Sequence, residues 1–260
     1  MRLAELSNII SVAQQKKLSG GITCNHLKIQ DNGSRMLTVS GDVTVTLKVF
    51  DLTTKGANQL HRLMNSTRSI ISEKLNGGSG LTGSVFLHKF DSIKKKFTND
   101  SDIYTVAYNL NYIIKLEQIT MLSQLSGNDF VLAVVDAISY KTDGAVSGGL
   151  TVFGGGPSSI SYDTWRRYPY LGAHEFFHAL KLSDLKGKTA TKNLMYEYAG
   201  TGHMEVTNDQ RLIMNRYIIR NLDEMYSSPY SNPNLNTVAN LRIFLNKIKN
   251  GIKYNKSKFR

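Results

Sequence analysis

The sequence predicts an α+β fold in which a mixed, twisted sheet packs against helices, and two features of its patterning lead to this conclusion. Strand-type runs fill 22–49, and an amphipathic segment of helical period follows at 53–75. A nearly continuous apolar run at 130–138 has the length of a strand buried on both faces, and a strongly apolar helical segment follows at 168–182. Strands and helices of these kinds form the packed layers of an α+β domain.

The composition is that of an ordinary globular protein. Apolar residues make up 41% and charged residues 20% of the 260-residue chain, and disordered chains contain fewer apolar residues. This length allows one sizeable domain or two small ones. The sequence contains no uninterrupted apolar window of about 18 residues, so we do not expect a membrane-spanning helix.

The N-terminal residues lack the apolar core of a secretory signal, because their longest apolar stretch, at 9–13, is short and Glu5 precedes it. Three locations stay open. The protein works in the cytosol, leaves the cell by a route without a cleaved signal, or is a fragment of a larger secreted protein.

Residues 1–41 are predicted to form a small helix-and-hairpin segment. Apolar residues recur at helical spacing over 3–18. The strand-type runs 22–30 and 35–40 enclose an Asn-Gly pair at 32–33, which is a strong hairpin signal. We place a domain boundary after this hairpin.

Residues 42–226 are predicted to form the main domain. Its strands are expected at 43–49, 85–90, 103–109, 130–138, 148–153 and 158–163, with 110–119 ambiguous. Its helices are expected at 53–75, 168–182 and 208–225. Thr53 or Thr54 can cap the first of these helices and Thr207 the last, because a threonine side chain accepts a hydrogen bond from the first helical turn.

Residues 227–260 are predicted to form a turn-rich linker, a helix at 237–249 and a basic tail. The residues from Arg242 to Arg260 include seven Lys or Arg and no acid, in a chain of net charge +12. Two interpretations of the tail stay open. It is either a solvated segment or a basic surface that contacts nucleic acid or an anionic membrane.

One short segment carries a pattern typical of metal chemistry. His174 and His178 are four residues apart in a helical segment, so both imidazoles can share one metal at about 2.0–2.1 Å. Glu175 follows the first histidine and can act as general base on a water at that metal. The neighbouring residues are almost all apolar, and polar side chains inside a buried helix need partners. The pattern therefore indicates a catalytic zinc site.

A catalytic zinc usually has three protein ligands and one open position. Asp184 lies six residues after His178, where the helix should end. Its carboxylate completes the ligand set if the chain turns back there. Glu197, His203 and Glu205 are the alternatives, and we favour Asp184.

The segment from His174 to Asp184 resembles the extended zinc signature of the metzincin metalloproteases. That signature is His-Glu-x-x-His-x-x-Gly-x-x-His, and Asp is the third ligand in a minority of members such as the snapalysins. Lys181 stands where the family has its glycine. A residue with a side chain must therefore make the turn at the end of the helix, either in a left-handed conformation or by another route.

The resemblance implies a metzincin-like fold over roughly 43–222 and roles for further residues. Met195 lies in a segment similar to the family's Met-turn and is expected to form the floor of the metal site. Tyr196 or Tyr198 would help to stabilise an oxyanion. An extended substrate would pair with an edge strand above the metal. The expected edge-strand residues are Gly149, Leu150 and Thr151.

The remaining candidate ligands are isolated in the sequence. Cys24 is the single cysteine, so no internal disulfide can form. No family-like sequence surrounds Cys24. We therefore expect a buried or idle thiol, and not a cysteine that binds the zinc and keeps the enzyme latent. His26, His61 and His88 are expected to be structural or surface residues.

The sequence thus predicts a zinc-dependent endopeptidase that acts on a protein or peptide substrate. Two other interpretations stay open. One is a basic binding module for nucleic acid or anionic membrane, with a structural metal or none. The other is a protease toxin domain released from a larger polypeptide. The presence of Glu175 argues against the binding module. A structural zinc site needs no general base and has a fourth protein ligand in place of the open position.

Overall fold

The computed structural model describes most of the chain between residues 21 and 219 and two short C-terminal stretches. The described residues are 21–91, 96–125, 129–139, 147–198, 200, 202–219, 241–245 and 251–259, with only the backbone described for 87–91, 96–101 and 259. The helix expected at 3–18 and the linker expected at 227–234 lie outside them.

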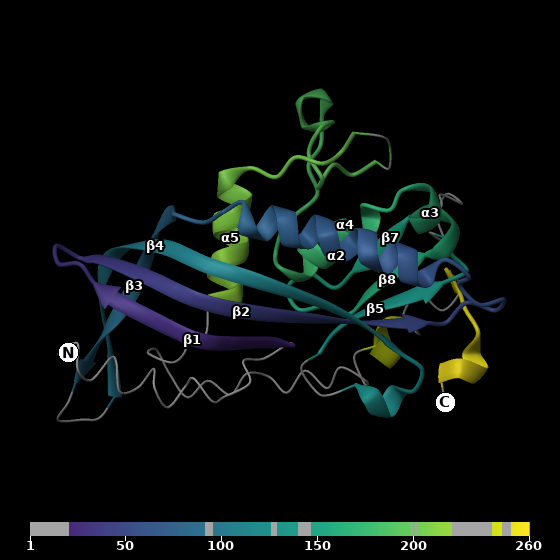
Figure 1. Ribbon diagram of the computed structural model, residues 1–260, viewed down its shortest axis with the longest axis horizontal. Coiled ribbons are helices and arrows are strands. Elements are labelled where there is room, and N and C mark those ends of the chain that lie inside the picture. The colour runs from purple at the N-terminus through teal and green to yellow at the C-terminus, as the bar shows by residue number, and fades with distance from the viewer. Residues whose placement is uncertain are drawn as a thin grey trace.

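A curled mixed sheet forms the centre of the molecule, and helices cover one of its faces (Figure 1). The strands are β1 (Ile22–Asp31), β2 (Met36–Asp51), β3 (Leu81–Asp91), β4 (Lys96–Ile119), β5 (Phe130–Val135), β6 (Ala137–Ile138), β7 (Gly149–Thr151), β8 (Ser158–Ser161) and β9 (Ile252–Lys253). The helices are α2 (Leu60–Asn76), α3 (Tyr162–Arg167), α4 (Leu171–Ala179) and α5 (Asn208–Ile219), and the 3-10 turns are η1 (Leu122–Gln124), η2 (Lys188–Ala190) and η3 (Lys256–Phe259). This mixed arrangement agrees with the expected α+β class.

The strand order places β7 at one end of the sheet. The order is β3-β4-β2-β5-β8-β7, and β1 and β5 share the side of β2 that faces away from β4. The pairs β2–β4, β2–β5 and β5–β8 are parallel, whereas β1–β2, β3–β4 and β7–β8 are antiparallel. Among the described residues, β7 therefore has one edge paired with β8 and no strand on the other.

The hairpin expected at the Asn-Gly pair is confirmed, but two of the expected strands are one. β1 and β2 pair around this turn. The runs 35–40 and 43–49 join in β2, which passes through the boundary placed after residue 41. Gly41 permits this continuity, because its φ is 148° and a bulge in β1 lies opposite. A Cβ atom on Gly41 would lie 2.9 Å from the Cα of Leu27.

The long helix over the sheet begins later than expected. α2 starts at Leu60, not at Thr53 or Thr54, because these two threonines bind carboxylates. The Thr53 hydroxyl donates to Oδ1 of Asp51 at 2.7 Å, and the Thr54 amide donates to Oδ1 of Asp136 at 3.0 Å. α2 ends at Asn76, close to the expected end at residue 75, and Gly77 and Gly78 follow it.

Other elements differ from the prediction in length. β3 and β4 are longer than expected, and the ambiguous segment 110–119 belongs to β4, which pairs with β2 up to its last residue. The expected strand 158–163 divides into β8 and the start of α3, a helix that the sequence did not predict. α4 is shorter than the expected helix 168–182 at both ends, and its C-terminal end comes early because the chain turns at Lys181, which has a φ of 72°.

The start of the closing helix is confirmed. Thr207 Oγ1 accepts a hydrogen bond from the Gln210 amide at 3.2 Å, and Gln210 Oε1 accepts one from the Thr207 amide at 2.9 Å. This reciprocal capping box fixes the first turn of α5. Within the described residues, no helix has the length and apolar character needed to cross a membrane.

β5 is buried on both faces, as predicted. Its even-numbered residues belong to the main core with α2 and α4, and its odd-numbered residues belong to a second core on the opposite face. The second core also contains Leu241, Phe244 and Leu245. Residues 241–245 are helical, inside the helix expected at 237–249.

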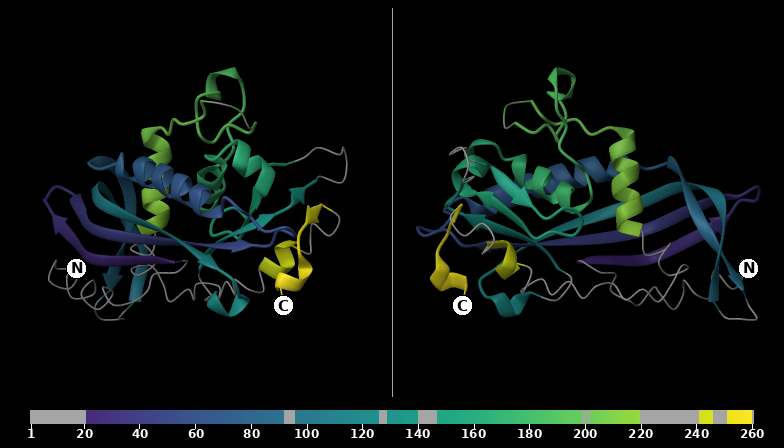
Figure 2. Two further views of the ribbon diagram at one scale, coloured as in Figure 1. Left: turned by 45° about the vertical axis from the view of Figure 1, so that its right-hand side comes forward. Right: turned by 180° about the vertical axis from the view of Figure 1, so that it is seen from behind.

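The described part of the basic C-terminal segment lies against the domain. β9 pairs antiparallel with β6, and the Asn255 amide donates to Leu52 O at 2.7 Å. Lys258 Nζ lies 3.5 Å from Oδ2 of Asp51. Figure 2 shows this segment below the sheet, away from α2. These contacts hold the backbone of residues 251–259 against the domain, which contradicts a freely solvated tail there, although the side chains of Lys253, Lys256 and Ser257 are exposed.

We predict that Gly172→Ala destabilises the protein by about 1–3 kcal/mol, the usual cost of overpacking. An added Cβ atom would lie 2.4 Å from Thr67 Oγ1 of α2 and 2.8 Å from Trp165 Nε1 of α3. In an unobstructed helix the same change stabilises by about 0.5–1 kcal/mol. Chemical denaturation measures the difference.

The control for Gly172→Ala is the same change made in a Thr67→Ala background. Removal of the Thr67 hydroxyl and methyl groups opens space, so the cost should be smaller there. A stabilising effect of Gly172→Ala in the otherwise unchanged protein would contradict the close contact between α2 and α4.

Candidate metal centre

α4 carries the metal-type motif and is buried on nearly every side. It packs against α2, β5, β7 and β8, and His178 is its one residue that is not fully buried. The glycine loop between β7 and β8, residues 154–156, donates hydrogen bonds to the last carbonyl groups of α4. The Gly154 amide donates to His178 O at 3.1 Å, and the Gly155 amide donates to Ala179 O at 2.7 Å. The two strands and the helix are thus fixed to one another.

The two histidines are oriented by backbone carbonyl groups. Nδ1 of His174 lies 2.8 Å from Leu194 O, and Nδ1 of His178 lies 2.6 Å from Leu182 O. A carbonyl oxygen can only accept, so each Nδ1 carries a proton, and in the neutral imidazole Nε2 is left with the lone pair. This is the tautomer that metal-binding histidines use.

Asp184 meets the two lone pairs. Its Oδ1 is 3.4 Å from His174 Nε2 and 3.2 Å from His178 Nε2, and the two Nε2 atoms are 3.1 Å apart. A tetrahedral zinc with bonds of about 2.0–2.1 Å places its ligand atoms about 3.3 Å apart. The three separations fit this geometry, and the chemistry of the donors, two imidazoles and one carboxylate, suits zinc.

Lys181 makes the turn that brings Asp184 to the histidines. Its φ of 72° is left-handed, the conformation that a glycine adopts easily. The Lys181 amide donates to His178 O, and the Leu182 amide donates to Phe177 O, both at 3.0 Å. Such bonds are typical of a helix that ends in a left-handed residue. Lys181 therefore adopts the left-handed backbone conformation that would be expected of a glycine at this position of the motif.

The segment around Met195 is fixed by a buried pair of amides. Asn193 Nδ2 donates to Gln210 Oε1 at 2.9 Å, and Asn193 Oδ1 accepts from the Met195 amide at 2.9 Å. The Tyr196 amide donates to Asn193 O at 3.1 Å and closes a turn. Met195 is completely buried, and its neighbour Leu194 supplies the carbonyl group that orients His174.

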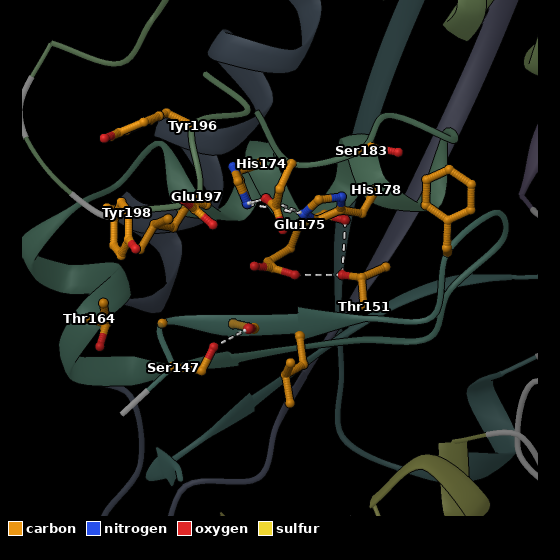
Figure 3. A pocket seen from close by; sticks show the side chains of 16 residues that line it. Ser147, Thr151, Thr164, His174, Glu175, His178, Ser183, Tyr196, Glu197 and Tyr198 are labelled. Carbon is orange, nitrogen blue, oxygen red and sulfur yellow. Dashed lines mark hydrogen bonds and ion pairs between the residues drawn. The ribbon is translucent and has the colours of Figure 1, made fainter. Parts of the chain in front are cut away.

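Glu175 lies against the edge strand, next to the histidines but apart from the group of three ligand atoms (Figure 3). Its Oε2 accepts a hydrogen bond from Thr151 Oγ1 at 2.6 Å. A Cβ atom on Gly149 would lie 2.4 Å from Oε1 of Glu175, so β7 needs a glycine at this point. Gly149 and Thr151 are two residues apart and face the helix, whereas Leu150 faces the second core.

The two carboxyl groups of the site have pKa values shifted in opposite directions. Hydrogen bonds that His174 and His178 donate when Nε2 carries a proton hold the pKa of the Asp184 carboxyl well below its usual range. Burial raises the pKa of the Glu175 carboxyl, although the two histidines and the Thr151 hydroxyl act against it. Asp184 is therefore held as an anion, and Glu175 is the carboxylate that more readily takes up a proton.

The alternative third ligands lie elsewhere. His203 donates from Nδ1 to Thr191 O and packs its ring 5.7 Å from that of Tyr170. Glu205 is exposed. Glu197 lines the cavity but is not one of the three residues whose ligand atoms all lie within 4.8 Å of one another.

A cavity of about 610 Å³ opens over the three ligand atoms. Tyr196 and Tyr198, expected to act on an oxyanion, both line it. Gly149, Leu150 and Thr151, expected at the edge strand, also line it. These five sequence-predicted residues thus share one cavity with His174, Glu175, His178 and Asp184, whereas Met195 does not line it.

The isolated candidates are not part of this cavity. Cys24 is buried in the main core, where burial raises the pKa of its thiol to about 11. His26 and His61 are exposed. The side chain of His88 lies outside the described residues.

Several residues of the site had no signal in the sequence. The partners of the two histidines are carbonyl groups, which any residue carries. The Asn193–Gln210 pair and the Gly149–Glu175 contact join segments 17 and 26 residues apart. Spacing along a single helix cannot find contacts of this kind.

Comparison with known proteins does not assign the chain to a family. No protein-family model and no curated protein sequence matches the chain. The resemblance to the metzincins therefore stays a prediction based on the motif residues.

We predict that Lys181→Gly stabilises the protein by about 0.5–1 kcal/mol. A left-handed residue with a side chain costs about 1–2 kcal/mol, and the greater freedom of glycine in the unfolded chain cancels part of the gain. Chemical denaturation of the two proteins gives the difference.

The matched control is Lys181→Ala, which keeps the left-handed backbone and removes the side chain that packs over Gly154. This variant should not be stabilised. If alanine stabilised the protein as much as glycine, the effect would come from the lysine side chain and not from the backbone.

Proposed function

We propose that the protein is a zinc-dependent endopeptidase of the metzincin type, with His174, His178 and Asp184 as zinc ligands. The observation that carries the proposal is the convergence of two oriented Nε2 lone pairs and one carboxylate oxygen within 3.1–3.4 Å of one another. Met195 underlies the site in this proposal. A buried carboxylate that is not a ligand, Glu175, distinguishes the site from a structural zinc site.

The zinc, when bound, lowers the pKa of a coordinated water toward about 7 and polarises the carbonyl group of the peptide. Glu175 takes the proton of the attacking water and delivers it to the leaving amine. Thr151 donates to Oε2 and so holds the carboxylate in place for this transfer. The burial that raises the pKa of Glu175 helps it to hold this proton between the two transfers.

The edge of β7 that no described strand covers favours an extended peptide as the substrate. In the β7–β8 ladder, Gly148 O accepts from Ser161 and the Val152 amide donates to Pro157 O. Hydrogen bonds alternate along an antiparallel pair, so Gly149 and Thr151 direct their backbone groups away from β8. A substrate that pairs with this edge lies over the cavity, as peptides do when they add a strand to a sheet.

We predict that the purified protein holds about one zinc per chain, and that Asp184→Ala weakens zinc binding more than about ten-fold. The carboxylate is one of three ligands in the proposal, so its loss leaves two neutral imidazoles. Elemental analysis after dialysis and a competition titration with a chelator measure the two quantities.

The control for Asp184→Ala is Glu205→Ala, which removes an exposed carboxylate outside the cavity and should leave zinc binding unchanged. Alanine at Glu197 or His203 should also leave one zinc per chain. Absence of zinc uptake by the unaltered protein would refute the metal centre. Loss of zinc on replacement of Glu197, His203 or Glu205, with retention in Asp184→Ala, would refute the ligand set.

We predict that Glu175→Gln keeps the fold and the zinc but lowers the rate of peptide cleavage by about 10²–10⁴-fold, the usual contribution of a general base. Glutamine preserves the size of the side chain and can still accept the Thr151 hydrogen bond. Cleavage of a diverse peptide library, followed by mass spectrometry with and without a chelator, measures the loss. Near-normal cleavage by a folded, zinc-loaded Glu175→Gln protein would place the base elsewhere.

A further inference from the structure

Glu197 is the charged residue of the cavity that the proposed metal chemistry does not use. Its side chain is 23% exposed, and its carboxylate faces the cavity between Tyr198 and His174 (Figure 3). The Glu197 amide donates to Leu185 O at 3.1 Å, which anchors the backbone at this point. The carboxylate is therefore held at the cavity wall.

The charges around the cavity leave Glu197 without an internal counterion. The charged lining residues are Glu175, Asp184 and Glu197, and no described lining residue is Lys or Arg. A zinc ion held by His174, His178 and Asp184 would offset the first two carboxylates. Lys186 Nζ lies 3.5 Å from Glu197 Oε2, but the lysine side chain is 78% exposed. Ion pairs as exposed as this contribute little, so a cation from a ligand can replace the lysine.

The wall beside Glu197 also suits a cation. Tyr198 is 64% exposed, and its ring lies 5.7 Å from that of Tyr196. The face of an aromatic ring attracts an ammonium or guanidinium group. A carboxylate next to the exposed ring of Tyr198 is therefore a surface for the side chain of arginine or lysine.

The position of Glu197 relative to β7 decides which residue of a peptide it meets. A Cβ atom on Gly148 would lie 3.2 Å from Leu171, at the start of α4, and one on Gly154 would lie 2.8 Å from Lys181, past its end. β7 and α4 thus run in the same direction. A peptide paired antiparallel to β7 has its C-terminal part at the Leu171 end.

Glu197 lies at this same end of α4. The ring of Tyr196 is 5.3 Å from that of His203, which packs 5.7 Å from Tyr170, the residue before α4. The Gly200 amide donates to the hydroxyl of Tyr170 at 3.0 Å. The segment around Glu197 therefore flanks the part of the cavity that takes residues after the cleaved bond.

We propose that Glu197 makes the enzyme select peptides with arginine or lysine on the C-terminal side of the cleaved bond, an inference that rests on the proposed peptidase function. The preference is local, because the net charge of +12 repels cationic peptides at long range. Arginine has the advantage of a planar group that can contact the carboxylate and a tyrosine ring together.

Peptide binding to the Glu175→Gln protein tests the preference without cleavage. The probes are end-blocked alanine hexapeptides that carry arginine, lysine, citrulline or glutamate at one internal position, and calorimetry measures their affinity. Citrulline has nearly the shape of arginine without its charge. We expect the arginine peptide to bind about ten-fold more tightly than the citrulline peptide, the effect of one charge-assisted hydrogen bond.

Two further changes, each made in the Glu175→Gln protein, assign the effect to Glu197. Glu197→Gln should remove the difference between arginine and citrulline, and Glu197→Lys should favour the glutamate peptide. Glu205→Gln changes the net charge of the protein by the same amount outside the cavity and should leave the difference intact. An alanine hexapeptide with a free amino group is a separate probe. If it bound as tightly as the arginine peptide, the assignment to a side chain would be overturned.

Cleavage by the unaltered protein separates this inference from the proposed function. Bonds followed by arginine or lysine should dominate the products of a peptide library. Cleavage without this preference, or an arginine preference that survives Glu197→Gln, would overturn the inference and leave the peptidase intact. A Glu197-dependent arginine preference in a protein that cleaves no peptide would support the cation site and overturn the peptidase.

Discussion

The burial of α4 is the constraint on which the rest of the site depends. A helix enclosed by a sheet and another helix cannot turn its polar side chains to water, so His174, Glu175 and His178 need partners within the protein. The partners are Leu194 O, Thr151 Oγ1 and Leu182 O, from three different segments. Each partner also fixes the direction of the side chain that it binds. Burial of these polar side chains costs free energy unless they are hydrogen-bonded. The hydrogen bonds that offset this cost also fix the orientation of each side chain.

The end of α4 transmits this constraint to the third proposed ligand. The glycine loop from β7 to β8 binds the last carbonyl groups of the helix, and Lys181 turns the chain in a left-handed conformation. Asp184 then reaches both histidines although its side chain is 45% exposed. A strained residue at this point is accepted because its neighbours on both sides are fixed. Strain of this kind persists where the surrounding structure determines the backbone course.

Two carboxylates with different surroundings divide the proposed chemistry between them. Asp184 has a lowered pKa because two imidazoles hydrogen-bond to it, and an anionic ligand offsets the charge of a dication. Glu175 has a raised pKa because it is buried, which suits a group that takes up and releases a proton. Glu197 has neither role in this scheme and stands at the cavity wall, where charge can act on the substrate.

The sequence by itself determined the elements with strong local signals. The period of the apolar residues, the Asn-Gly turn and the Thr207 cap predicted β1, the hairpin into β2, the two-faced burial of β5 and the start of α5, because each signal acts within a few residues. The four-residue spacing of His174 and His178 likewise follows from one turn of helix. Only the tertiary structure decided that β2 is one strand, that residues 251–259 pack on the domain, and that Asp184, not Glu197, His203 or Glu205, meets the histidines. Those outcomes depend on contacts between distant segments, such as Gly149 against Glu175 and Asn193 with Gln210. Local pattern carries no information about which distant segment fills a given space, because that choice is made by the packing of the whole core.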